Sequence, residues 1–170
     1  FTKCEVSIPT YACVIEEEKP RFVGVKEVLQ VSVYNTVELL KQELLIHKGE
    51  LEESWHLQSL EKWFIEKRIY KEKKYENAKT TDDALDFIHD KAVEHELKLI
   101  REITRDDLLK LLEIRMKRIL KFNSDKAEED LNKILEEIKK IQHNLDNLTA
   151  FAIKYYQGIK KKYGTGRERK

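Results

Sequence analysis

Residues 123–163 read NSDKAEEDLNKILEEIKKIQHNLDNLTAFAIKYYQGIKKKY. Apolar side chains recur here at alternating steps of four and three residues, which is the spacing of a coiled-coil seam. A helix of this length would be about 60 Å long, and it cannot bury such a seam alone. The sequence therefore predicts a helix from Asn123 to Tyr163 that needs a partner helix. Its seam consists of Ala127, Leu131, Ile134, Ile138, Ile141, Leu145, Leu148, Ala152, Tyr155 and Ile159.

The composition also favours long helices. Charged residues make up 38% of the 170 residues, and there are only 5 glycines and 2 prolines. The net charge is +1, but residues 125–137 are mainly acidic and residues 160–170 mainly basic. Neither an apolar run long enough to cross a membrane nor a signal peptide is present, so we expect no membrane partner and a cytoplasmic location. We expect Cys4 and Cys13 to be reduced thiols, with a disulfide as the alternative.

The first thirty residues differ from the rest of the chain. Residues 4–8, 12–15 and 21–25 are short apolar or alternating runs separated by Pro9 and Pro20, which predicts three short strands. So small a sheet is marginal by itself, and we expect its other strands to lie in a longer protein from which this sequence is excised. Residues 25–31 predict a short helical turn.

Residues 33–75 form a second long helical pattern. Val37, Leu40, Leu44, His47 and Leu51 follow heptad spacing, as do Leu57, Leu60 and Phe64, but the two runs are out of phase. Gly49 and the polar residues 52–54 lie at the join. A continuous helix with a slipped register explains this pattern, and a local hinge is the alternative.

Two shorter helices are predicted between the long ones. Thr80 or Thr81 begins a helix over residues 82–99. Thr104 begins another that runs to Phe122, with Asp107 placed to reach back to the helix start. The second helix is apolar around most of its circumference, so it must be covered on more than one face. We expect another chain to cover one face, formed by Leu108, Leu112, Ile114, Met116 and Ile119.

The predicted fold is mainly α (α+β): an antiparallel two-helix coiled coil with a helical dimerisation cap and a short β segment at its base. The segments are 1–32 (β), 33–76 (outgoing helix), 77–122 (cap), 123–163 (returning helix) and 164–170 (exit linker). Paired residue numbers should total about 200 across the coiled coil. This register places Leu44 opposite Tyr155, Leu51 opposite Leu148, Leu60 opposite Ile138 or Ile141, and Phe64 opposite Leu135.

No catalytic constellation is visible in the sequence. His47, His56, His89, His95 and His143 lack the i, i+4 spacing of a helical metal site, so we predict no metal ligands. Phosphate-binding glycine loops, a GxSxG motif and a CxxC motif are absent from the sequence as well. We therefore expect no catalytic residue and no cofactor in this segment.

Four segments, in order, resemble the A subunits of bacterial type IIA DNA topoisomerases, a family that includes DNA gyrase and topoisomerase IV. Residues 55–70 (WHLQSLEKWFIEKRIY) are similar to the outgoing arm of that family, and residues 112–119 (LEIRMKRI) to the motif at its distal dimer gate. Residues 144–149 (NLDNLT) and 162–169 (KYGTGRER) resemble the returning arm and its exit. The resemblance covers nearly the whole chain.

The resemblance implies a role as well as a fold. Residues 1–30 would belong to the tower domain beside the cut duplex, and the remainder would form the arm and exit gate of a homodimer. The parent would be an ATP-dependent DNA topoisomerase that uses Mg²⁺, pairs with an ATPase (B) subunit, acts on double-stranded DNA and associates with the nucleoid. Its nucleophilic tyrosine has an arginine–tyrosine–threonine context that no tyrosine here shares, so this segment would be inactive. Residues expected near DNA are Lys160, Lys161, Lys162, Arg167, Arg169 and Lys170.

A stand-alone coiled-coil stalk that binds another protein is the alternative to this interpretation. The residues that precede Phe1 in the full protein would separate the two hypotheses, because a domain with the nucleophilic tyrosine should lie there. Gyrase and topoisomerase IV cannot be told apart from this segment, because their difference lies largely in a further C-terminal domain.

Overall fold

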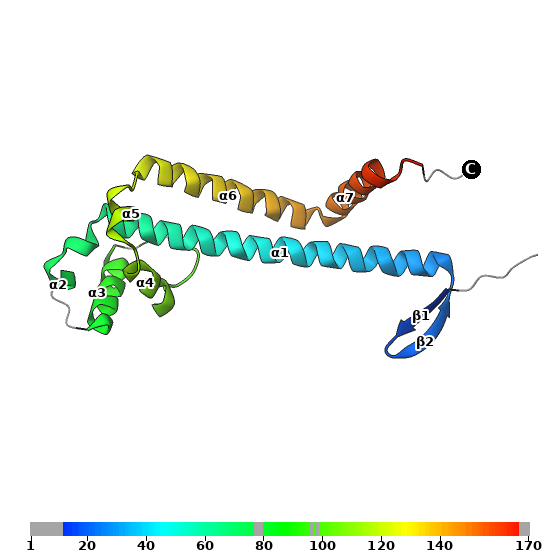
Figure 1. Cartoon of the computed structure of the whole chain (residues 1–170), viewed down its shortest axis with the longest axis horizontal. Coiled ribbons are helices and arrows are strands. Elements are labelled where there is room, and N and C mark those ends of the chain that lie inside the picture. The colour runs from blue at the N-terminus through cyan, green and yellow to red at the C-terminus, as the bar shows by residue number, and fades with distance from the viewer. Residues whose placement is uncertain (1–11, 77–79, 96, 98, 167–170) are drawn as a thin grey trace, which may run out of the picture. The chain divides into compact units, whose positions relative to one another are not determined.

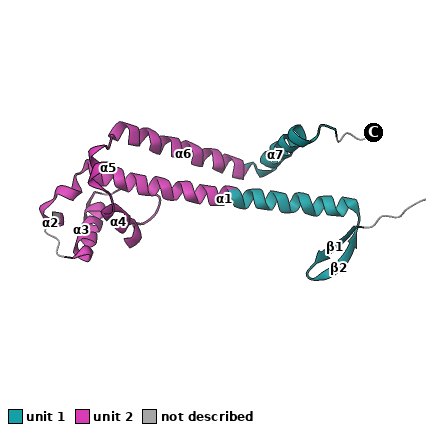
Figure 2. Ribbon diagram, viewed as in Figure 1, with its two compact units in different colours: residues 1–43, 147–170 teal, residues 44–146 magenta. Residues whose placement is uncertain are grey.

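A computed structural model describes residues 12–76, 80–95, 97 and 99–166 (Figure 1). It is mainly helical with one short two-stranded sheet, which confirms the predicted fold class. Residues 1–43 and 147–170 form one compact unit and residues 44–146 the other (Figure 2). The elements are β1 (Ala12–Glu16), β2 (Lys19–Val23), α1 (Val25–Glu66), the 3₁₀ helix η1 (Ile69–Lys71), α2 (Lys73–Glu76), α3 (Thr81–Glu94), α4 (Arg105–Leu112), α5 (Met116–Leu120), α6 (Ser124–Asp146) and α7 (Leu148–Tyr163).

Strands β1 and β2 form an antiparallel hairpin in the first unit. Ala12 pairs with Val23 and Glu16 with Lys19, so Glu17 and Glu18 make a two-residue turn. Both turn residues have positive φ, 49° and 64°, which matches the twist of a tight hairpin although neither is glycine. Two of the three predicted strands are present, but the one predicted at residues 21–25 lies at 19–23 and includes Pro20, which the prediction had placed between strands. The strand predicted at residues 4–8 lies outside the described residues.

Helix α1 begins earlier and ends earlier than the sequence pattern predicted. Residues 25–31, predicted as a separate turn, are its first turns, and the helix passes through Gly49 and residues 52–54 without interruption. The continuous-helix alternative is thus the one that the structure supports. The helix ends at Glu66 rather than near Tyr75, because Arg68 adopts a left-handed conformation with φ 53° and ψ 37°.

The returning helix is broken, whereas the sequence predicted one rod from Asn123 to Tyr163. Helix α6 ends at Asp146, and Asn147, with φ −116° and ψ 44°, precedes the first residue of α7. The Asp146 carboxylate accepts a hydrogen bond from Gln142 at 2.9 Å. Short polar side chains such as those of Asp146 and Asn147 compete with backbone hydrogen bonding, so two in succession favour a helix end even within an apolar heptad pattern.

Within the second unit, α1 and α6 run antiparallel and are joined by polar contacts. Lys48 donates to Gln142 at 2.9 Å, Lys62 to Glu128 at 3.0 Å, and the Ser124 hydroxyl to Glu66. The residue numbers in each pair total 190 and not about 200, so within this unit the predicted register, which opposed Leu60 to Ile138 or Ile141 and Phe64 to Leu135, is wrong by about ten residues. The cause is the early end of α1, which brings Glu66 and not Tyr75 to the start of the returning helix.

The predicted coiled-coil seam differs in burial along its length. Leu44, Leu60, Phe64, Leu131 and Ile141 are buried, and the side chains between them are half-buried: Leu51, Ile134, Ile138, Leu145 and Leu148. Tyr155, by contrast, is 43% exposed. Burial therefore follows the seam through α6 and as far as Ala152 in α7, which is 5% exposed, and is lost at Tyr155 and Ile159.

The core of the second unit lies around the end of α1. Leu60, Phe64 and Ile69 are at most 2% exposed and pack with apolar side chains from α3 and α4, namely Leu85, Ile88, Ala92, Leu108 and Leu111. The Thr80 side chain accepts a hydrogen bond from the Asp83 amide at 3.2 Å, which confirms a helix start there. Helix α3 ends at Glu94, five residues before the predicted end at Leu99.

Shortening a core side chain tests this packing. Leu60→Ala removes a fully buried side chain and should lower the free energy of unfolding by about 2–5 kcal/mol, as buried leucine truncations do. Leu39→Ala is the matched control, because Leu39 lies on the same helix and is 64% exposed. Urea unfolding followed by circular dichroism measures both variants. Equal losses of stability would contradict the assignment of the core.

Candidate functional site

The surface of the helical cap, residues 81–120, is the candidate functional site. The sequence predicted a single helix from Thr104 to Phe122, but the structure divides it into α4 and α5. Arg115 is extended, with φ −70° and ψ 140°, and begins α5. The break turns the apolar side chains of Ile114 and Ile119 toward the core, against which both pack. One helix would have left part of its apolar circumference exposed, and this burial explains the break.

The five residues predicted at a dimer interface fall into two groups. Leu108 is only 4% exposed, and Leu112, Ile114 and Ile119 are half-buried against the same core. Met116 is 59% exposed. The burial of Leu108 leaves that side chain no surface to offer to a partner.

Leu120 is a second exposed apolar residue of α5, and the sequence pattern does not single it out. Leu120 lies one turn after Met116 on α5 and is 81% exposed, so the two side chains share one face of the helix. We call Met116 and Leu120 together the apolar tip. Leu109 on α4 is 38% exposed. A continuous helical pattern hides the apolar tip, because only the break before α5 decides which residues face outward.

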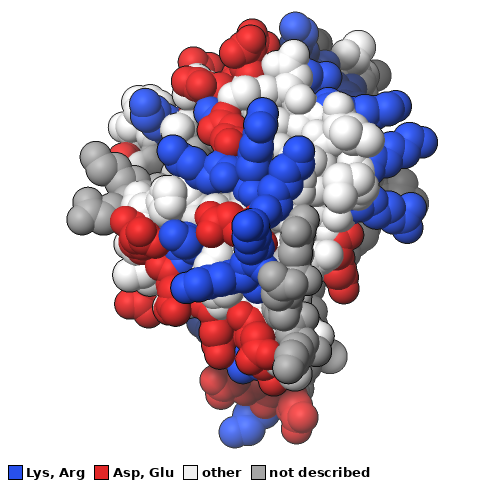
Figure 3. All heavy atoms as spheres, turned by 90° about the vertical axis from the view of Figure 1, so that its left-hand side faces the viewer, with Lys and Arg blue, Asp and Glu red and all other residues white. Residues whose placement is uncertain are grey.

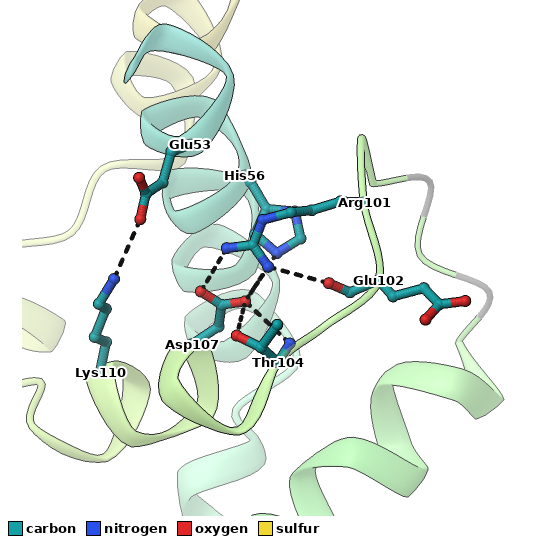
Figure 4. A network of polar contacts seen from close by, with 7 residues as sticks. All are labelled: Glu53, His56, Arg101, Glu102, Thr104, Asp107 and Lys110. Atoms are coloured by element: carbon teal, nitrogen blue, oxygen red, sulfur yellow. Dashed lines mark hydrogen bonds and ion pairs between the residues drawn. The ribbon is translucent and has the colours of Figure 1, made fainter. Parts of the chain in front are cut away.

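A buried carboxylate attaches α4 to α1 (Figure 4). Asp107 is 1% exposed and accepts two hydrogen bonds from the guanidinium of Arg101, at 2.6 and 2.8 Å. The backbone amide and the hydroxyl of Thr104 also donate to it, at 3.0 and 2.8 Å, which confirms the predicted reach back to the helix start. Nε2 of His56, from α1, lies 3.4 Å from the same carboxylate. A surface ion pair between Lys110 and Glu53, at 3.5 Å, adds a second link.

These surroundings shift two pKa values. Burial alone would raise the pKa of the Asp107 carboxyl, but the hydrogen bonds from Arg101 and Thr104 outweigh burial and hold that pKa far below its ordinary value. Burial lowers the pKa of His56, and the charge of Arg101 lowers it further, while Asp107 opposes the shift. His56 is therefore neutral at pH 7. The network is an ionised carboxylate paired with Arg101 and flanked by a neutral imidazole.

The sequence revealed half of this network. The spacing of Thr104 and Asp107 predicted their contact, whereas Arg101 and His56 carry no local signal that joins them to Asp107. The spacing of the histidines bears only on metal binding and does not link His56 to Asp107. Within the described residues, no three His, Cys, Asp or Glu side chains are grouped closely enough to hold a metal ion.

The basic residues predicted near DNA lie at the end of the chain. Lys160, Lys161 and Lys162 are exposed in the last turn of α7, where positive charge also complements the helix dipole. Arg167, Arg169 and Lys170 lie outside the described residues. None of the helices that the structure describes is both long and apolar enough to cross a membrane.

Comparison with known proteins defines the class to which this arrangement belongs. The sequence profile of the A subunits of DNA gyrase and topoisomerase IV matches residues 1–157. The chain therefore belongs to the DNA gyrase/topoisomerase IV A-subunit family.

A curated relative gives a second comparison. The chain is similar to the A subunit of DNA topoisomerase 4 from Borreliella burgdorferi, with 27% identity over 170 residues. The alignment covers 100% of this chain but 27% of the relative, so the chain spans about a quarter of the length of that protein. No solved structure matches the chain.

The state of His56 predicts how stability depends on pH. Because the folded-state pKa lies below the ordinary value of 6.5, the unfolded chain binds a proton more readily and stability should fall as pH decreases through about 6.5. The loss is at most about 1.4 kcal/mol per pH unit for one group. His56→Gln should remove this part of the dependence, and His89→Gln, which replaces an exposed histidine, should keep it. Urea unfolding between neutral pH and pH 5 measures all three proteins; identical slopes would contradict the assignment.

Proposed function

We propose that this chain is the arm and exit gate of a type IIA topoisomerase A subunit. Membership of the family supports the parent assignment, and the apolar tip on α5 is the observation that supports the gate. Met116 and Leu120 are exposed on a cap whose neighbouring apolar side chains, Ile114 and Ile119, pack against the core. A second copy of the chain would cover it across a two-fold axis, and each copy would contribute the same residues.

The physical properties of the tip suit a contact that must open. Burying one large apolar side chain contributes about 1.5–3 kcal/mol, and two-fold symmetry doubles the contribution of every residue. A few such anchors can hold a dimer without the large apolar area of a permanent interface. The polar network under α4 would keep the tip in place while the dimer opens and closes.

The hairpin supports the assignment of the first residues to a tower domain. Ile15 and Phe22 are 82% and 72% exposed, whereas large apolar side chains of a sheet usually pack on one of its faces. Further parts of the parent would cover them. The parent would use ATP and Mg²⁺ together with an ATPase partner, act on double-stranded DNA in the cytoplasm, and place Lys160, Lys161 and Lys162 near the cut duplex.

Charge at the tip should abolish dimerisation. Leu120→Glu and Met116→Glu would each place two unpaired carboxylates in the contact, and either should give a folded monomer where the unchanged chain is a dimer. Ile46→Glu is the matched control, because Ile46 is 65% exposed on α1 and should leave the dimer intact. Sedimentation equilibrium measures the masses, and circular dichroism checks folding. A monomeric unchanged chain, or a Leu120→Glu variant that remains dimeric, would refute the gate.

The proposal also predicts that the 170-residue chain does not cut DNA. Its tyrosines lack the sequence context of the family's nucleophile, so incubation with supercoiled plasmid, Mg²⁺ and ATP should leave the plasmid unchanged. Denaturing electrophoresis after such a reaction would reveal any covalent protein–DNA adduct. An adduct on any tyrosine of this chain would show that the assignment of roles is wrong.

A further inference from the structure

A basic groove lies beside the corner between α5 and α6. It has a volume of about 560 Å³ and is lined by side chains from α1, α5 and the first turns of α6. Five of its lining residues are basic and two are acidic. Four of the basic side chains are exposed and form no ion pair with any carboxylate in the described part of the chain: Arg115, Lys117, Lys121 and Lys126.

The acidic residues of the groove are already neutralised. The Glu61 carboxylate pairs with Arg118, and Asp130 pairs with Lys133 at 2.9 Å. The other four side chains therefore form no ion pair with the groove's own carboxylates, although further acidic residues such as Asp125 and Glu129 lie close to them in sequence. Cations concentrated around a concave surface create a positive potential that attracts anions.

A second basic segment adjoins this groove. Residues 67–74 contain five exposed bases and one acid, and they follow α1 directly. The contact between Glu66 and the Ser124 hydroxyl places the start of this segment next to the first turn of α6. Figure 3, which faces the left-hand end of Figure 1, shows Lys and Arg side chains near the middle of this surface, with Asp and Glu side chains among them. Positive charge at this end of the second unit thus extends beyond the groove.

We propose that this basic groove binds the phosphate backbone of duplex DNA. The inference rests on the proposed function, which brings a duplex past the cap. Amide groups of Gln58 and Asn123 also line the groove and can donate to phosphate oxygens. Contacts between cationic side chains and phosphates carry no sequence information, so this backbone binding should depend strongly on salt.

Charge neutralisation tests the proposal on the 170-residue chain. A variant with Arg115, Lys117, Lys121 and Lys126 all changed to Gln should bind a short fluorescent duplex on the order of tenfold or more weakly at low salt. The slope of log affinity against log salt should fall by about 3 to 4, since each lost phosphate contact contributes about 0.9. The matched control changes four exposed lysines elsewhere, Lys41, Lys139, Lys140 and Lys154, and so removes the same charge.

The outcomes separate the explanations. A large loss in the groove variant, with little change in the control, supports the proposal. Equal losses in the two variants would show a general charge effect, and unchanged affinity of the groove variant would exclude the groove; either result overturns the proposal. Binding of poly-glutamate as tightly as DNA would also overturn it, because it would indicate an acidic protein partner.

Sedimentation of the same samples distinguishes this proposal from the gate. A monomeric chain that binds DNA through the groove would refute the gate alone. A dimer whose DNA affinity does not depend on the groove would refute this proposal alone.

Discussion

The position of the cap depends on the buried carboxylate of Asp107. A charge that is 1% exposed is stable only if it is paired and hydrogen-bonded, and Asp107 satisfies this through Arg101 and Thr104. Removing one partner of such a pair typically costs about 3–5 kcal/mol. His56 on α1 lies 3.4 Å from the same carboxylate, so this charge is buried at the contact between the start of α4 and α1. Helix α5 begins four residues after the end of α4, so the position of the apolar tip depends on the position of α4.

A second constraint is the residue at which α1 ends. The left-handed conformation of Arg68 stops the helix and turns the chain, so that Ile69 enters the core at 1% exposure. Burial of Ile69 contributes enough to offset the roughly 1–2 kcal/mol that a left-handed non-glycine residue costs. The same ending sets where α6 can begin, and hence the register of the antiparallel pair.

The second unit separates its surfaces by chemistry. Apolar packing occupies the interior, two apolar side chains project from α5, and unpaired cations surround the groove beside α6. Along α1 and α6, by contrast, many charges are paired within or between the helices, as Lys62 is with Glu66 and Glu128. Such exposed ion pairs contribute little stability, but they reduce the electrostatic potential at the surfaces of α1 and α6. An apolar partner would therefore bind at the apolar tip, and a negatively charged partner would bind at the basic groove.

The sequence by itself determined the mainly α class, the helix starts at Thr80 and Thr104, and two short strands, predicted at residues 12–15 and 21–25 and found at 12–16 and 19–23. These features depend on local spacing, on capping side chains and on apolar periodicity, all of which act over a few residues. Tertiary structure alone decided that α1 ends at Glu66, that α5 separates from α4, and that Leu108 is internal while Leu120 is exposed. It also brought His56 and Arg101 to Asp107. Most of these outcomes depend on packing or polar contacts with other segments of the chain, and periodicity within one segment carries no information about such contacts.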